Sequence, residues 1–364
     1  MMRWLKRKSL FYTVLYVLIM GIIGAILYTR YEILTEKYTQ RHIDMFDQRI
    51  ESYQLMQQRM LDSYFHLFLE SPQIALIMEE ASRSEPSVQA VLRRELMGRT
   101  EEMFRALQGF DVRLLFFHLP GSVGFLRVHE PEKFGDSLAA SRPSVLLAQN
   151  SQKKVVTFET GKLFDGFRTI YPLFHHGKFV GTVELAYPFA ALKNQAMRQS
   201  PGAYTFLIKR SVQEGKATSA DINKHYEDSL FGSEYLEDKE SALHKGAKGY
   251  KKGELEALLR YHQTTIQKAF KKGRLQGIKL LYKGSYSLLT LKPVKEIGGE
   301  DAAYMVEITP NHTFFADQWN QFVVLVTLIA FLLAVLMWYI YRFNRSVILL
   351  EQYKNAIDDS MIVS

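Results

Sequence analysis

The sequence of 364 residues contains no cysteine. Disulfide bridges, cysteine-ligated zinc, iron–sulfur clusters and thiol catalysis are therefore excluded together. The sequence also lacks a Walker motif, a metal-protease helix, a kinase signature and a Ser-His-Asp arrangement, so we expect this chain to be no enzyme and to hold no cofactor. Any exported part must be held together by packing alone.

The charge balance is basic, with a formal net charge of +8 and a pI of about 9.3. Much of the excess lies in a basic stretch between Lys245 and Lys283, at Lys248, Lys251, Lys252, Lys268, Lys271, Lys272, Arg274 and Lys279. A solvated face is the simpler interpretation, and a membrane-proximal surface that attracts lipid head groups is the alternative. For the chain as a whole we expect the membrane as a partner and no nucleic acid.

Two long uncharged runs predict membrane-spanning helices. Ser9–Tyr28 and Phe322–Tyr341 contain no charged residue, and helices of this length, at 1.5 Å per residue, cross the ~30 Å hydrocarbon core. A cleaved signal peptide would have an apolar run of about 7–15 residues and a small-residue cleavage site, which does not follow Tyr28. Candidate interface aromatics are Tyr16, Tyr28, Trp319, Trp338, Tyr339 and Tyr341.

Basic residues flank the two runs on the same side. Four precede the first run, and Arg342 and Arg345 follow the second. The positive-inside rule therefore places residues 1–8 and 342–364 in the cytoplasm and exports the region between the runs. The pattern predicts a multi-pass membrane protein with a large exported domain between two spans.

Residues 29–110 are predicted to form a long helix followed by shorter ones. Apolar residues recur at steps of three and four, at Ile43, Phe46, Ile50, Tyr53, Met60, Tyr64 and Leu67. This spacing is typical of an a/d seam. The seam is interpreted as packing against its own domain or as the contact of a homodimer, and the same helix could do both. Pro72 and Pro86 mark two shorter helices, the second over residues 87–107.

From Asp111 the hydrophobic period becomes that of strands. VRLLFFHL, GFLRVHE, KKVVTFETG, GFRTIYPLFHHG and KFVGTVELAYP predict an antiparallel sheet in residues 111–200, with a hairpin at His175–Lys178. A second module over residues 201–316 has predicted strands AYTFLIKR, SYSLLTLKPVKE and AAYMVEITP, and helices near Ala220–Asp228 and Lys252–Phe270. The fold class is α+β, with two spanning helices, at 9–28 and 322–341, flanking a long helix and two tandem modules.

Polar residues are densest among the apolar strands of the first module. The segments FLRVHEPEKFGDSLAASRP, FETGKLFDGFRTIYP and GKFVGTVELAYP resemble the pattern of double-Cache sensory domains, whose two modules are PAS-like. Such domains occur in bacterial chemoreceptors, histidine kinases and diguanylate cyclases. The matching residues are Phe125, Leu126, Arg127, His129, Pro131, Phe134, Gly135, Asp136, Leu138, Arg142, Glu159, Gly161, Gly166, Arg168, Pro172, Gly181 and Glu184.

The resemblance implies a two-component or related receptor of the bacterial inner membrane with a large periplasmic domain. A small molecule would bind in the membrane-distal module, and the membrane-proximal module would pass the change through the second span to a cytoplasmic output domain. The segment after Arg345 resembles the helix that leads into a PAS domain, so we expect the chain to end, at Ser364, near the start of one. The Tyr-x-x-x-x-Arg-x-Trp pattern of amino-acid-binding relatives is not found, so an amino acid is not the first choice of ligand.

Side chains in the matching segments suit a small organic anion such as a carboxylate. Fork-shaped guanidiniums are available at Arg127, Arg142 and Arg168. Apolar walls are predicted from Phe125, Phe158, Phe167 and Tyr171, and the other candidates are His118, His129, Asp136 and Glu159. The alternative is that Arg127, Asp136 and Glu159 only pair with one another, because buried charges persist only when paired. The two histidines are more typical of core or rim positions than of metal ligands, so no metal is expected.

Two other classes of protein stay open on the sequence. One is a membrane-anchored enzyme or transport accessory, and the other is an exported structural or protein-interaction module without a small-molecule ligand. Thermal-shift screening of the exported region separates them from a receptor, because a ligand that binds only the folded state raises its stability.

Overall fold

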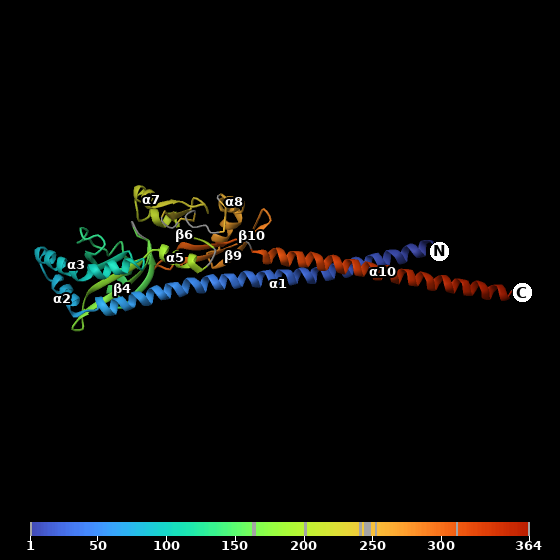
Figure 1. The fold of residues 1–364 in the computed structure, drawn as a ribbon, viewed down its shortest axis with the longest axis horizontal. Helices are drawn as coiled ribbons and strands as arrows, with labels where there is room; N and C mark the ends of the chain where they lie inside the picture. Colours follow the sequence, from blue (N-terminus) through green and yellow to red (C-terminus); the bar gives the residue numbers. More distant parts are fainter. Residues whose placement is uncertain are drawn as a thin grey trace. The chain divides into compact units, whose positions relative to one another are not determined.

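The computed structural model describes residues 2–161, 165–199, 202–239, 242–243, 249–251, 253–310 and 312–362. Two compact units form the chain (Figure 1). The larger unit is Gln40–Asn311, and the smaller one combines Met1–Thr39 with His312–Ser364.

The smaller unit is built from the first part of α1 (Met2–Tyr64) and from α10 (Thr313–Ile362). Both helices are long and apolar enough to cross a membrane, as the sequence predicts, and their apolar windows are exposed. Aromatic side chains join the helices beyond one end of these windows. The ring of Tyr38 stacks on Phe314 with centroids 4.1 Å apart, and its hydroxyl lies 2.9 Å from Nδ1 of His312.

In the larger unit, the predicted seam of α1 faces its own domain. Phe46 and Ile50 are each 1% exposed and belong to the same apolar core as Met305 of the second module. The interpretation as packing against the domain is confirmed, and the use of these side chains as a dimer contact is wrong because their area is already covered. The π-helix η1 (Phe65–Leu69) then shifts the periodicity, which leaves Leu67 exposed.

Two helices that begin with proline cover one face of the first sheet. They are α2 (Pro72–Ala81) and α3 (Pro86–Gln108). Proline has no backbone N–H, and at the first position of a helix that N–H would have no partner within the helix, so nothing is lost. The hydroxyl of Ser71 caps α2 by accepting a hydrogen bond from the amide of Ile74 at 3.2 Å. α2 packs on β4 and β5, and α3 packs on β2.

The first sheet is antiparallel with the order β2-β1-β5-β4-β3. Its strands are β1 (Leu114–Leu119), β2 (Val123–Arg127), β3 (Val155–Glu159), β4 (Gly166–His175) and β5 (Lys178–Tyr187). Helix α4 (Pro143–Ser151) packs against β3, β4 and β5. The predicted hairpin is confirmed: His176 and Gly177 have φ of 46° and 78°, the left-handed pair that a type I′ turn requires.

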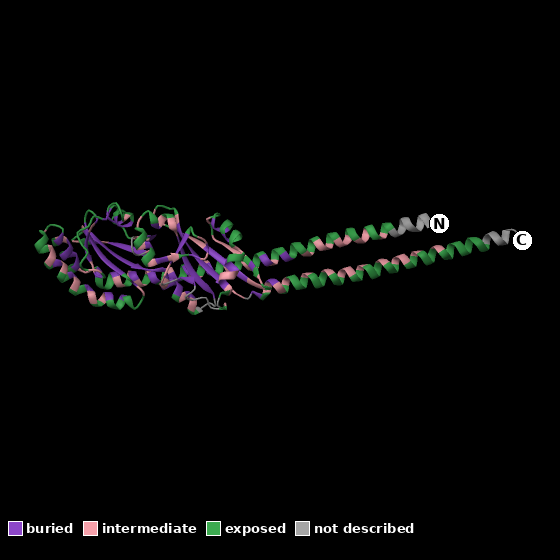
Figure 2. Ribbon diagram, turned by 90° about the horizontal axis from the view of Figure 1, so that it is seen from above, coloured by how far each residue is buried: buried purple, intermediate pink, exposed green. Residues whose placement is uncertain are grey.

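The second sheet is also antiparallel and has the order β7-β8-β6-β11-β10-β9. Its strands are β6 (Ala203–Lys209), β7 (Tyr226–Asp228), β8 (Tyr235–Asp238), β9 (Gln276–Tyr282), β10 (Ser285–Lys295) and β11 (Asp301–Thr309). Its helices are α5 (Phe189–Gln199), α6 (Arg210–Glu214), α7 (Ser219–His225), α8 (Glu254–Tyr261) and α9 (Gln263–Phe270). Figure 2 shows the strands of both sheets as largely buried.

Three strands of the second sheet depart from the prediction. β8 and β9 are absent from the predicted strands, and the helix predicted to reach Asp228 ends at His225, after which the chain forms β7. In the basic stretch, Lys251, Lys268, Lys271, Lys272, Arg274 and Lys279 are exposed, in agreement with a solvated face. Pro201, Lys245, Lys248, Lys252 and Asn311 lie outside the described residues.

An aromatic cluster joins the two modules, and an ion pair joins the long helix α1 to the second one. Phe206 of β6 lies 5.2 Å from Phe158 of β3, centroid to centroid. On the second sheet, Nη1 of Arg49 in α1 donates to Oε1 of Glu307 in β11 at 2.7 Å and to the hydroxyl of Tyr204 at 2.6 Å. The long helix is therefore fixed to the last strand before α10.

Candidate functional site

The side chains of the candidate site come from one face of the first sheet. Residues that pair across antiparallel strands share a face, and Arg168 of β4 pairs with Ala186 of β5 while Ile170 pairs with Glu184. Phe116 and His118 of β1 pair with Glu184 and Thr182 on the same face. Helix α4 and the loop before it cover this face of the sheet. The opposite face packs on α2 and α3.

An enclosed cluster of charges lies under α4. Oε1 of Glu184 accepts hydrogen bonds from Nη2 of Arg142 and from Nη1 of Arg168, both at 2.6 Å. Nε of Arg142 lies 3.3 Å from Oε2 of Glu159, which also accepts a hydrogen bond from the hydroxyl of Ser144. The carboxylate of Glu184 is completely buried. Two guanidiniums thus face two carboxylates, so the cluster has no net charge if His118 is neutral.

Four buried polar atoms of this cluster make no hydrogen bond of good geometry among the described residues, although Nε of Arg142 lies 3.3 Å from Oε2 of Glu159 and Nε2 of His118 lies 3.5 Å from Oε2 of Glu184. They are Nε2 of His118, Nε of Arg142, Oε1 of Glu159 and Oε2 of Glu184. Each such atom costs about 1–3 kcal/mol if nothing satisfies it. The four atoms offer donors and acceptors together, which is the chemistry that a small polar molecule would use.

The buried charges perturb one another strongly. Burial, together with the positive charges of Arg142 and Arg127, lowers the pKa of His118 to about 3, so this imidazole is neutral at physiological pH. Burial alone would raise the pKa of Glu184, but the guanidiniums of Arg142 and Arg168 outweigh it and lower the pKa to about 2. The carboxylate of Glu184 is therefore ionised whenever the domain is folded near neutral pH.

Arg127 and Asp136 form a second, more exposed pair beside the cluster. The guanidinium binds the carboxylate through two hydrogen bonds of 2.8 and 2.7 Å and also donates to the carbonyl of Lys133. Its Cζ lies 4.1 Å from the ring centroid of Phe116, which in turn contacts His118. The pairing of Arg127 with Asp136 that the sequence left as an alternative is present in the structure.

Gly124 explains why this pair fits so closely against the sheet. A Cβ atom at this position would lie 2.8 Å from Oδ1 of Asp136 and 2.9 Å from the ring of Phe116. Any side chain here would displace the Arg127–Asp136 pair, so the glycine keeps the loop seated on the sheet.

The structure separates several predicted site residues from the cluster. Tyr171 is on the opposite face of β4, where its hydroxyl donates to Oδ1 of Asp62 at 2.8 Å. Phe158 and Phe167 face the second module as part of the aromatic cluster around Phe206. These three residues are not walls of a pocket around Arg168, because neighbouring residues of a strand point to opposite faces.

The two remaining candidates are at the margin. Phe125 belongs to the helix-covered core, with Cζ of Arg93 5.5 Å from its ring centroid. Nδ1 of His129 lies 3.2 Å from the carbonyl oxygen of Leu115, and burial lowers its pKa. The structure therefore brings His118, Arg142, Glu159 and Arg168 together, with Arg127 and Asp136 beside them.

Sequence reasoning missed residues that the cluster depends on. Glu184 matched the family pattern, but it was not among the expected ligand contacts, although it is the carboxylate that joins the two arginines. Gln149 of α4 accepts a hydrogen bond from the amide of Ser122 and donates one to the carbonyl of Leu119, both at 2.9 Å. A buried acid in an otherwise apolar strand was the signal that pointed to Glu184. Among the residues that the structure describes, no group of three or more acidic or histidine side chains is arranged to hold a metal.

Known proteins resemble this chain in family pattern and in fold. A family model described as the double sensory domain of two-component sensor kinase matches residues 54–299, and no curated protein matches the chain. The sensory domain of the Campylobacter jejuni chemoreceptor Tlp3 with isoleucine bound is 10% identical, with a TM-score of 0.39 over 79% of this chain and 97% of that one. The sensor domain of the V. cholerae histidine kinase DctB is 13% identical, with a TM-score of 0.40 over 75% and 98%. The E. coli DcuS sensor domain is 17% identical, with a TM-score of 0.25 over 35% and 84%.

Proposed function

Because the chain belongs to the family of double sensory domains of two-component sensor kinases, we propose that it is the sensing and transmembrane-signalling part of a bacterial inner-membrane receptor. In this proposal α1 and α10 cross the membrane, and Gln40–Asn311 lies outside the cytoplasm. The sensory domain itself is non-catalytic. A cytoplasmic output such as a kinase or a diguanylate cyclase would receive the signal through α10.

The ligand in this proposal is a small organic anion bound in the membrane-distal module. The observation that supports it is the cluster of charged side chains around Glu184. Arg142 and Arg168 are buried guanidiniums that share a single carboxylate oxygen. A ligand carboxylate has the same geometry as the side chain of Glu184 and would compete with it for these two forks. Oε1 of Glu159, which accepts no hydrogen bond among the described residues, would bind a further donor group of the ligand.

Calorimetry on the Gln40–Asn311 unit, with a ligand found by thermal-shift screening of small carboxylic acids, tests this site. A charge-assisted hydrogen bond contributes about 1.5–3 kcal/mol, so Arg168→Ala is expected to weaken binding about tenfold to a hundredfold. Arg168→Lys keeps the charge but loses the planar fork and should recover only part of the affinity. Arg127→Ala is the matched control, because Arg127 is already bound to the half-exposed Asp136.

Two results would contradict the ligand proposal. Equal affinity in the folded Arg168→Ala and Arg142→Ala variants would move the site away from the cluster. If no small molecule stabilises the domain, the internal pairing of the arginines would favour the second candidate, a structural or protein-interaction module.

Signal transfer in this proposal runs through the second module, because β11 leads directly towards α10. The Arg49–Glu307 ion pair connects the same strand to α1. A ligand biases this system only if it binds one of two states more tightly. Reporter fusions test the topology: a fusion after Arg345 should be active in the cytoplasm and a fusion after Lys216 outside it. The reverse pattern would contradict the receptor proposal.

The receptor is also proposed to act as a homodimer. Since Phe46 and Ile50 are buried, a dimer contact on α1 would use the opposite face of the helix, which exposes Met45, Leu55 and Met56.

A further inference from the structure

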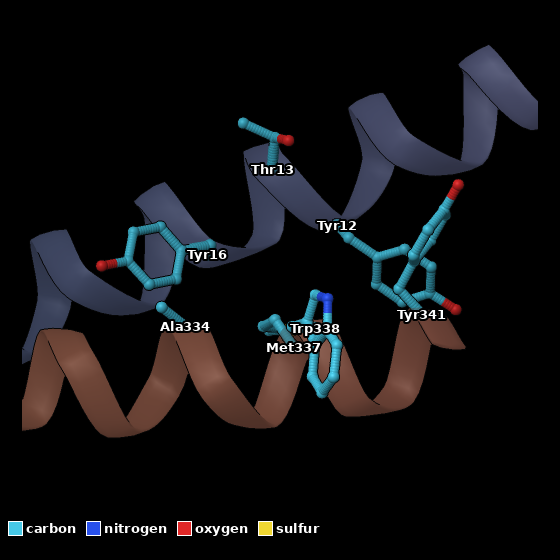
Figure 3. Close-up of a pocket in the computed structure, with 7 residues that line it drawn as sticks. All are labelled: Tyr12, Thr13, Tyr16, Ala334, Met337, Trp338 and Tyr341. Carbon is cyan, nitrogen blue, oxygen red and sulfur yellow. The ribbon is translucent and has the colours of Figure 1, made fainter. Parts of the chain in front are cut away.

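A groove opens between the two helices of the smaller unit, with a volume of about 260 Å³. Figure 3 shows its lining from both helices. The residues are Tyr12, Thr13 and Tyr16 of α1 and Ala334, Met337, Trp338 and Tyr341 of α10. These positions lie near the start of the first apolar run, Ser9–Tyr28, and near the end of the second, Phe322–Tyr341. Under the proposed topology, the groove lies in the cytoplasmic leaflet.

The groove is polar at one end and apolar along its length. At the polar end, the rings of Tyr12 and Tyr341 meet edge to face with centroids 6.5 Å apart, and the amide of Asn344 donates to the hydroxyl of Tyr12 at 2.6 Å. Further in, the hydroxyl of Tyr16 donates to the carbonyl of Ala330 at 3.2 Å, which leaves carbon atoms to line the wall. A molecule with a polar head and an apolar tail matches this gradient.

Positive charge gathers at the polar end. Cζ of Arg342 lies 5.5 Å from the ring centroid of Trp338, one of the lining residues, and Arg345 follows one turn later. Both arginines are exposed, and neither forms an ion pair within the described residues. The sequence adds Arg3, Lys6, Arg7 and Lys8 before the first apolar run. An anionic head group is therefore the electrostatic complement of this end.

We propose that the groove binds an anionic phospholipid of the cytoplasmic leaflet, with its phosphate at Arg342 and Arg345 and an acyl chain along Ala334 and Met337. This inference rests on the topology proposed above. A helix from a second copy is a poorer fit, because close helix packing in membranes uses small residues at the contact, whereas tyrosine, tryptophan and methionine side chains dominate this lining.

Native mass spectrometry of the full chain, purified in mild detergent and stripped of lipid, tests the proposal. Phosphatidylglycerol and phosphatidylcholine with identical acyl chains serve as probes, and we expect phosphatidylglycerol to be retained at least tenfold more strongly. Arg342→Gln and Arg345→Gln should each weaken its retention about fivefold. They should weaken that of phosphatidylcholine less, because the positive choline offsets the charge of the same phosphate.

A change that fills the groove separates a bound lipid from general surface attraction. Ala334→Phe should abolish the retention of phosphatidylglycerol without altering charge. Val335→Phe is its matched control, since Val335 is exposed on the next position and does not line the groove, and it should leave retention unchanged.

Two outcomes would overturn the inference directly: equal retention of the two lipids, or retention of phosphatidylglycerol that survives Ala334→Phe. A lipid-free dimer that Ala334→Phe dissociates would also overturn it, because the groove would then be the contact with a second copy of the chain. The reporter fusion after Arg345 checks the topology independently. Loss of lipid selectivity with Arg345 in the cytoplasm overturns the lipid site alone, whereas an exported Arg345 overturns the proposed function.

Discussion

Replacing Glu184 with glutamine should destabilise the Gln40–Asn311 unit severely, although the two side chains have nearly the same shape. The glutamate carboxylate is completely buried and joins Arg142 and Arg168 through hydrogen bonds of 2.6 Å. Both hydrogen bonds end on the same oxygen of Glu184, so the amide oxygen of glutamine can still accept them. The amide carries no charge, however, and places an NH₂ donor where the second carboxylate oxygen was. Two buried guanidiniums would then face the single carboxylate of Glu159.

The magnitude follows from two independent arguments. Removing one partner of a buried ion pair typically costs about 3–5 kcal/mol. By linkage, a pKa of about 2 in the folded state, set by Arg142 and Arg168 against the opposing effect of burial, compared with the ordinary 4.5, corresponds to about 3 kcal/mol at neutral pH. Because the folded pKa is the lower one, this stability is present above pH 4.5 and is lost as the pH falls towards 2.

Urea unfolding of the Gln40–Asn311 unit, wild type against Glu184→Gln, measures the effect. The difference in unfolding free energy should be about 3–5 kcal/mol at pH 7 and should shrink as the pH is lowered from 4.5. Asp136→Asn is the matched control: it also breaks a two-bond ion pair, but the carboxylate of Asp136 is 49% exposed, so the loss should be at most about 1 kcal/mol.

Two results would refute this reasoning. If Glu184→Gln costs no more than Asp136→Asn, the buried charges do not stabilise the cluster. If the difference does not change with pH, it arises from shape and not from charge.

Two further predictions follow from burial. His118 is neutral in the folded domain, with a pKa of about 3 against the ordinary 6.5, so its imidazole is protonated in the unfolded chain at a higher pH than in the folded one. Below pH 6.5 the wild type should therefore lose about 1.4 kcal/mol more unfolding free energy per pH unit than His118→Asn. Parallel pH dependence of the two proteins in urea unfolding would contradict this. In membranes, single cysteines at the exposed Met45 and Met56 should cross-link between chains, whereas cysteines at the buried Phe46 and Ile50 should not; cross-linking at Phe46 would instead place the predicted seam in a dimer.

Local patterns were sufficient to predict much of the fold. The apolar runs of α1 and α10, the prolines that start α2 and α3, and the turn at His176–Gly177 all depend on neighbours in sequence. β9 was missed because it lies at the sheet edge, where only Leu280 is buried, so its pattern does not alternate between apolar and polar. The α7 prediction ran too far because Tyr226 caps the helix in an extended conformation.

The candidate site was harder to predict because residue type does not determine the partner. The sequence indicated that Arg142 and Arg168 would bind a carboxylate, but it did not indicate that Glu184 supplies one. Glu184 lies on β5, two residues from Ala186, which is the residue that pairs with Arg168. Phe158 and Phe167 have the composition of pocket walls, yet the second module covers them. The spacing of Phe46 and Ile50 is the same for a core and for a dimer, so only the tertiary structure distinguished the two.

The absence of a break in α1 sets a condition on the number of residues between its apolar run and its buried seam. The helix is continuous from Met2 to Tyr64, and each residue of a helix adds about 100° of rotation and 1.5 Å of length. Inserting one residue between Glu36 and Gln40 would therefore turn the apolar run by about 100° relative to the buried face of Phe46, whereas inserting seven would restore the angle to within about 20°. The length of this segment thus fixes a helical phase as well as a distance, so an insertion that preserves composition but not phase would change which residues of α1 continue the line of its buried face.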